Sequence, residues 1–154
     1  MHLKLILLLI IGLASISCDT DVEQFLKDFR EKSNVKLNEF FEAAKNNPAK
    51  AFVMLNKVSW HLCGFEQPIN NHILGTVLAA EPYKSEKTEL LNYFGIGSSS
   101  SSEGSYEEYG GVFRIGTLGK KSGLYSFTLK DNLENGAVKD WRFTSITKLQ
   151  CEGY

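Results

Sequence analysis

The stretch Tyr125-Ser126-Phe127-Thr128-Leu129-Lys130 indicates the fold class of this chain. Apolar and polar side chains alternate along it with a period of two, which is typical of a β-strand with one buried and one solvated face. Residues 138–151 alternate in the same way, and the segment 132–136 before them is rich in turn-forming residues. We therefore expect two neighbouring antiparallel strands joined by a hairpin.

The strand pattern extends upstream and predicts an inner face. Residues 88–96 and 109–118 are candidate strands, and the turn-rich segment 119–123 makes an antiparallel meander of the last three strands the expected topology. An unbroken alternation on the last strand puts these side chains on the inner face: Trp141, Phe143, Ser145, Thr147 and Leu149. We expect Trp141, Phe143 and Tyr125 to pack there against Phe25, Phe29 and Phe40.

The N-terminal part of the chain has helical periodicity. Residues 21–45 carry two apolar stripes at helical spacing, Val22, Phe25, Leu26 and Phe29, then Leu37, Phe40, Phe41 and Ala44. Ser33-Asn34 between the stripes is a candidate bend or break. Asn47 and Pro48 suit the cap and first position of a short helix that ends at Leu55. Residues 58–65 resemble a strand that ends in a turn at Gly64, and residues 68–80 a further helix.

Residues 97–111 interrupt the strand pattern. They contain the serine run Ser98–Ser102 and Ser105, embedded in Gly and Glu, and this composition provides little for a core. We expect a flexible Ser-rich loop between strands. A phosphate-binding loop would need a following helix and a lysine, and the sequence provides neither.

The first residues have the pattern of a secretory signal peptide. Lys4 precedes the apolar run 5–13, and small residues 14–18 follow. The run is too short to cross a hydrocarbon core of about 30 Å as a helix. We expect a signal peptide over residues 1–18, cleaved after Ser17 or Cys18, and a single secreted domain over 19–154. Acylation of Cys18, as in bacterial lipoproteins, is disfavoured because Ser15 stands where Leu is preferred.

Composition excludes some classes of partner. The chain is 43% hydrophobic and 12% aromatic, which is enough for one core. The net charge is −1 and there is no basic stripe, so we expect neither nucleic acid nor, after signal cleavage, a membrane as partner. Outside the cytosol nucleotide cofactors are scarce, so we expect no cofactor.

The cysteines are Cys18, Cys63 and Cys151. Cleavage after Cys18 leaves an even pair that can form one disulfide between Cys63 and Cys151, whereas cleavage after Ser17 leaves an odd thiol. A secretory compartment favours the disulfide, and two buried free thiols are the alternative.

The order of helices, a short strand, a helix and several long strands is an α+β order. Together with Cys63-Gly64 and the ending Asp140-Trp141-Arg142-Phe143-Thr144-Ser145-Ile146 before Cys151, it resembles the small secreted NTF2-like domains of nematodes. The resemblance covers residues 21–151. It implies a cone in which a curved, mostly antiparallel sheet wraps around N-terminal helices and encloses a pocket. It implies no fixed chemistry, because this fold serves enzymes and non-enzymes alike.

The inner face supplies the candidate ligand pocket, with these lining residues: Tyr125, Phe127, Trp141, Phe143, Ser145 and Thr147. Apolar walls with two hydroxyls suit a small, largely apolar ligand. The alternative is an ordinary core face whose hydroxyls bond to the backbone.

Two other sites are weaker. NTF2-like enzymes place an Asp or a His-Asp pair in the cone, and His61 with Asp140 is the pair that this sequence offers for general acid–base work. His61, Cys63 and His72 lack the paired spacing of zinc ligands, so we expect no metal site.

Three functions follow as hypotheses. The first is a secreted, non-enzymatic domain that binds a small apolar molecule or a protein partner. The second is a secreted hydrolase or isomerase with an acid–base pair in the cone. The third is homodimerisation through the outer sheet face, which predicts exposed apolar side chains there. A buried titratable pair that faces one cavity would favour the enzyme.

Overall fold

A computed structural model describes residues 2–55, 58–101 and 104–154, with side-chain burial for 22–55, 58–100 and 104–154. The helices are α1 (His2–Asn46), α2 (Pro48–Leu55) and α3 (Asn71–Ala79), followed by the 3-10 turn η1 (Tyr83–Ser85). The strands are β1 (Thr88–Ser101), β2 (Gly104–Gly116), β3 (Ser122–Glu134) and β4 (Ala137–Glu152). They form one antiparallel sheet in the order β1-β2-β3-β4, which confirms the α+β class and the meander.

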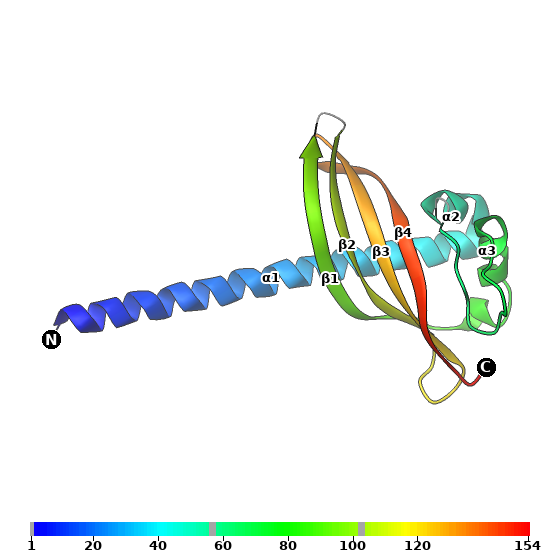
Figure 1. The fold of residues 1–154 in the computed structure, drawn as a ribbon, viewed down its shortest axis with the longest axis horizontal. Helices are drawn as coiled ribbons and strands as arrows, with labels where there is room; N and C mark the ends of the chain where they lie inside the picture. The colour runs from blue at the N-terminus through cyan, green and yellow to red at the C-terminus, as the bar shows by residue number, and fades with distance from the viewer. Residues whose placement is uncertain (1, 56–57, 102–103) are drawn as a thin grey trace.

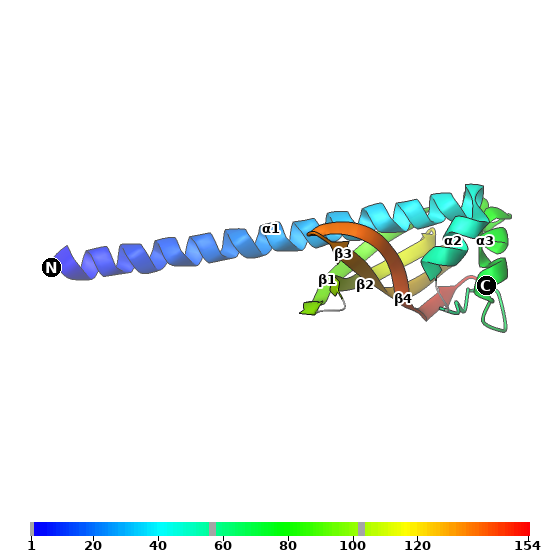
Figure 2. The same ribbon diagram turned by 90° about the horizontal axis from the view of Figure 1, so that it is seen from above.

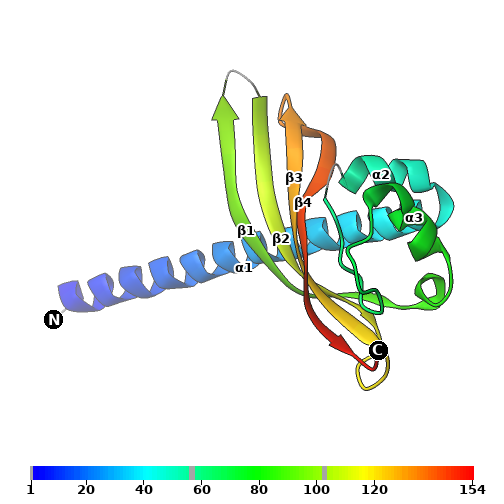
Figure 3. The same cartoon turned by 45° about the vertical axis from the view of Figure 1, so that its right-hand side comes forward.

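The sheet is curved, and α1 lies along its concave side (Figures 1 and 2). The N-terminal turns of α1 project beyond the sheet, while α2 and α3 lie beside the C-terminal end of α1 (Figure 3). This arrangement buries the second apolar stripe of α1, from Leu37 to Ala44, against the inner face of the sheet, as the two patterns predicted. The prediction that Phe25 of the first stripe packs there is wrong, because its side chain is largely exposed. None of the helices in the described part of the chain is long and apolar enough to cross a membrane.

The core between α1 and the sheet is rich in aromatic side chains. Phe113 on β2 lies at its centre, with its ring centroid 5.9 Å from Phe41, 5.6 Å from Trp60, 5.3 Å from Tyr125 and 5.6 Å from Phe127. All these rings are buried, and Phe40 packs edge-on against Phe143 at 5.0 Å. Burial of Tyr125, Phe127 and Phe143 confirms that they face inward.

Bulges in β4 change which side chains face inward. The β3–β4 pairing shifts between Thr128 and Leu129, where Thr144 is an extra residue on β4. The shift reverses the alternation, so Ile146 is buried, while Ser145 and Thr147 are exposed. A bulged strand also bends and twists more strongly, which fits the curvature of the sheet. The prediction that Ser145, Thr147 and Leu149 share the inner face with Trp141 is therefore wrong.

Two adjacent glycines on β2 lie against the backbone of the neighbouring strands. A Cβ on Gly110 would lie 2.2 Å from the carbonyl oxygen of Phe127, and one on Gly111 would lie 2.2 Å from that of Asn92. No side chain fits at such distances, so glycine is required at both positions.

The Ser-rich segment is not a loop where the structure describes it. Residues 97–101 pair with 104–108 as the outer ends of β1 and β2. Backbone pairing with a neighbouring strand needs no apolar side chains, so a serine run continues a hairpin that the core has already fixed. Ser102 and Glu103 lie outside the described residues.

Other predicted helices and strands differ from the structure over short segments. Helix α1 is continuous through Ser33-Asn34, because Ser33 is buried against the core instead of facing solvent. Helix α3 begins at Asn71, since the Asn70 side chain accepts a hydrogen bond from the His72 amide at 2.9 Å. Residues 58–65 form no strand but a single bridge between Trp60 and Ile69.

The signal-peptide prediction concerns residues 1–18. Met1 and the side chains of residues 2–21 lie outside the described residues, so it stays a prediction. The first apolar stripe just beyond is mostly exposed, with Val22 at 52%, Phe25 at 56% and Leu26 at 39%.

Candidate functional site

A groove of about 570 Å³ lies between α1 and the inner face of the sheet, near the hairpin that joins β3 to β4. Its apolar walls come from Phe25, Phe29 and Val35 on α1 and from Val138 at the start of β4. Phe29 is half-buried and packs on Tyr109 of β2, with ring centroids 5.7 Å apart. The groove therefore begins where the aromatic core ends.

A buried carboxylate lies at the base of this groove. Asp131 is only 1% exposed, although it carries an ionisable side chain. It continues the inner face of β3, in phase with Tyr125, Phe127 and Leu129, where an apolar residue is the usual occupant. A charge in such a position needs partners or a function.

The two carboxylate oxygens of Asp131 have different surroundings. Oδ2 accepts a hydrogen bond from the Tyr109 hydroxyl at 2.9 Å. Oδ1 is buried and has no hydrogen-bond partner among the described residues, and the nearest cation, Lys36 Nζ, is 3.9 Å away. Burial raises the pKa of Asp131, although Lys36 and Tyr109 oppose the shift. Burial and the neighbouring carboxylate also raise the pKa of Tyr109, so its hydroxyl remains a donor at neutral pH.

Two lysines, one helical turn apart on α1, face two acidic residues on the sheet. Lys32 Nζ lies 2.7 Å from Glu107 Oε2. Lys36 lies close to Asp131 and also over the Trp141 ring, 5.1 Å from its centroid. Glu107 and Asp131 are directly opposed on β2 and β3, so the lysines offset a like-charge pair. The four charges of this cluster sum to zero when all are ionised.

We expect Asp131→Asn to gain stability relative to the wild type as the pH rises from about 3 to about 7. Below the unfolded pKa, near 3.8, both states carry a protonated carboxyl and the burial cost is small. At higher pH the folded state, whose pKa is raised, must ionise a buried group, so wild-type stability falls. Urea unfolding at several pH values measures the difference. Asp28→Asn, at an exposed carboxylate beside the same groove, is the control; an equal effect there contradicts this account.

The structure separates most of the residues expected to form a pocket. Tyr125, Phe127 and Phe143 are 0–1% exposed and fill the core. Trp141 is half-buried, and its Nε1 donates to Glu39 Oε2 at 3.1 Å. Ser145 and Thr147 lie on the outer face, where the Ser145 hydroxyl contacts Thr128 Oγ1 at 2.7 Å. The candidate groove therefore lies farther along the sheet than the sequence indicated.

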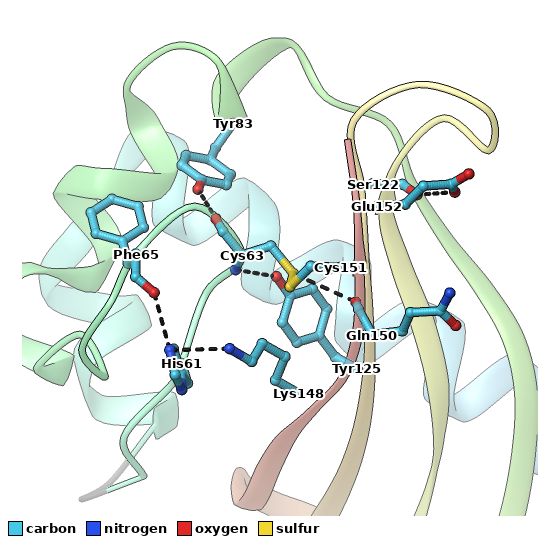
Figure 4. Close-up of a disulfide and its surroundings, with 10 residues drawn as sticks. All are labelled: His61, Cys63, Phe65, Tyr83, Ser122, Tyr125, Lys148, Gln150, Cys151 and Glu152. Carbon is cyan, nitrogen blue, oxygen red and sulfur yellow. Dashed lines mark hydrogen bonds between the residues drawn. A yellow bond between two sulfur atoms is a disulfide. The ribbon is translucent and has the colours of Figure 1, made fainter. Parts of the chain in front are cut away.

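His61 and Asp140 have separate partners. His61 Nε2 lies 3.0 Å from the Phe65 carbonyl oxygen and 3.1 Å from Lys148 Nζ (Figure 4). The Asp140 carboxylate accepts a hydrogen bond from Asn132 Nδ2. The structure thus gives this pair no shared acid–base geometry.

The residues considered for a metal site also have other roles. His72 stacks on Phe52, with centroids 4.5 Å apart, and Cys63 is in a disulfide. Among the described residues, no group of three or more His, Cys, Asp or Glu side chains is placed to hold a metal ion. His72 and Asp140 instead line a second, open depression beside Trp141.

The predicted disulfide joins Cys63 to Cys151, with Cα atoms 5.6 Å apart. It ties the segment between α2 and α3 to the end of β4 (Figure 4). The Tyr83 hydroxyl donates to the Cys63 carbonyl at 2.6 Å, and the Tyr125 hydroxyl accepts from the Cys63 amide at 2.9 Å. Burial raises the pKa of Tyr83 to about 12, so this hydroxyl remains a donor at neutral pH.

No protein-family model matches the chain, and the comparison with curated proteins finds no match. The groove is therefore the feature of this chain that bears on function. Its central residues, Asp131 and Tyr109, are not among the site residues predicted from the sequence. A signal was present, since Asp131 is an acidic residue in phase with the apolar face of an alternating strand.

Proposed function

We propose that this protein is a secreted, non-enzymatic domain that binds a small, largely apolar molecule in the groove between α1 and the sheet. The observation that carries the proposal is the combination of an apolar-walled groove of about 570 Å³ with a buried, incompletely paired carboxylate. Ligand sites typically combine this size range and apolar lining with a few placed polar groups.

The exposure of the groove walls supports a ligand. Phe25, Val35 and Val138 are 56%, 55% and 44% exposed, although each is apolar and lines the same groove. An apolar ligand removes this surface from water at roughly 25 cal/mol per Å². The described part of the aromatic core needs no such contribution, because its side chains already bury one another.

Secretion and the NTF2-like relationship belong to the same proposal. The disulfide fits an oxidising compartment, and the leader pattern in residues 1–18 agrees with that. A curved antiparallel sheet around an N-terminal helix is the architecture that the resemblance implied. These observations support an NTF2-like secreted domain, and the function rests on the groove alone.

Binding of the neutral apolar dye N-phenyl-1-naphthylamine tests the proposal. We expect saturable fluorescence enhancement with the folded protein. Val35→Gln, at the groove wall, should weaken it about fivefold through lost apolar contact. Val53→Gln is the matched control, because Val53 is also exposed, at 69%, but lies at the second depression. No saturable binding, or equal weakening by both variants, would contradict the proposal.

A second candidate function is favoured by the Asp131–Tyr109 pair, which is buried and adjoins the groove. A carboxylate with a raised pKa is suited to take a proton from carbon beside a carbonyl group, as an isomerase requires. Tyr109 would then hold Asp131 in position through its hydrogen bond to Oδ2. Exchange of the α-protons of 2-decanone with D2O, catalysed by the wild type and lost in Asp131→Asn, would favour this candidate over simple binding.

A further inference from the structure

We infer that the ligand of the groove is an apolar alcohol whose hydroxyl donates a hydrogen bond to Asp131 Oδ1. This inference rests on the proposed binding function and specifies the chemistry of the ligand's polar end. It starts from the difference between the two oxygens of Asp131, only one of which accepts a hydrogen bond from the described residues.

Asp131 Oδ1 lacks a hydrogen-bond donor among the described residues. Ionised carboxylate oxygens only accept hydrogen bonds, so a molecule without an O–H or N–H group cannot form one with Oδ1. A buried acceptor without a partner is costly, and supplying that partner is a direct source of affinity. Tyr109 is already committed to Oδ2, and Lys36 Nζ, at 3.9 Å, is beyond hydrogen-bond distance of Oδ1.

Lys36 fits this ligand chemistry. Its ammonium lies 3.9 Å from Oδ1 in a long ion pair, stands over the Trp141 ring and is also attracted by the Glu39 carboxylate. The Lys36 side chain has four rotatable bonds, so rotation about them can move Nζ away from Oδ1 and make room for a hydroxyl between the two atoms. A hydroxyl in that position donates to the carboxylate and accepts from the ammonium, which satisfies both groups.

The charges around the groove base disfavour an ionised head group. Asp131 and Glu107 would repel a carboxylate, and Lys32 and Lys36 would repel an amine. The cluster at the groove base holds two charges of each sign. Asp28 and Glu31 also line the groove, but both are exposed and screened by water, so neither ion gains a strong net attraction at Oδ1. A neutral group that both donates and accepts meets no such opposition, and the hydroxyl is the simplest one.

Displacement of bound N-phenyl-1-naphthylamine by two isomers tests the inference. 1-Decanol and 1-methoxynonane have the same atoms, but only the alcohol donates a hydrogen bond. We expect the alcohol to displace the dye at about tenfold lower concentration from the wild type, as a hydrogen bond to a charged group implies. Asp131→Asn should reduce this ratio to about twofold or less, and Glu66→Gln, at an exposed carboxylate that does not line the groove, should leave it unchanged.

Each outcome decides something. Equal displacement by both isomers, or a ratio that survives Asp131→Asn, overturns the alcohol while leaving the binding function intact. Stronger displacement by decylamine or decanoic acid than by 1-decanol overturns the neutral head group. No dye binding by the wild type overturns both the inference and the proposed function. The wild-type comparison of isomers needs no variant, so it stands even if Asp131→Asn does not fold.

Discussion

Replacing both Cys63 and Cys151 with serine is expected to lower the free energy of unfolding by about 4–5 kcal/mol. The disulfide closes a loop of 88 residues, and in the chain-entropy model a loop of that length restricts the unfolded chain by about this amount. The native contacts around it, including the hydrogen bonds from and to Cys63, involve the backbone and survive the substitution. Most of the loss therefore arises in the unfolded state.

Urea unfolding of the oxidised wild type, the reduced wild type and the double serine variant measures this effect. The last two should agree within about 1 kcal/mol, because both lack the cross-link. A difference under about 1 kcal/mol between oxidised and reduced wild type would contradict the bridge. Tyr125→Phe is a useful additional variant, because it removes the hydroxyl that accepts a hydrogen bond from the Cys63 amide and leaves the disulfide in place.

Phe113→Ala is expected to cost about 3–5 kcal/mol, the range for truncating a large aromatic in a packed core. Phe113 is 0% exposed and its ring contacts aromatic side chains from α1, from the segment before α3 and from β3. Few rearrangements can refill a cavity among such rigid neighbours, so the loss should lie in the upper part of that range.

The matched control for this variant is Phe94→Ala on β1. Phe94 is 38% exposed, so the same truncation should cost about 1 kcal/mol or less. Urea unfolding of both variants gives the comparison. Similar losses for the two would show that the sheet does not present Phe113 to α1 as described.

Sequence patterns predicted the fold through periodicity. The stripe Leu37, Phe40, Phe41 and Ala44 on α1 is buried, and so are Tyr125, Phe127 and Leu129 on β3. Both periods persist because each element packs one continuous face against the other. The disulfide was also predicted, since a secretory context and an even cysteine pair favour a single pairing.

The errors have local physical causes. Alternation fails on β4 because Thr144 bulges, and a bulge of this kind leaves no mark in a sequence of alternating residues. The serine run 97–101 was expected to be a loop because its side chains lack apolar surface, yet backbone pairing to β2 does not depend on that. The groove was not predicted because Asp131 was not assigned to the inner face of β3.

The most direct test of the binding account is where an apolar probe contacts the protein. In two-dimensional amide NMR, adding N-phenyl-1-naphthylamine should shift most strongly the signals of Phe29, Lys32, Val35, Asp131 and Val138, which line the groove. Shifts concentrated at Phe52 and His72, or at Leu91 and Leu118, would place the probe at other depressions and contradict the account.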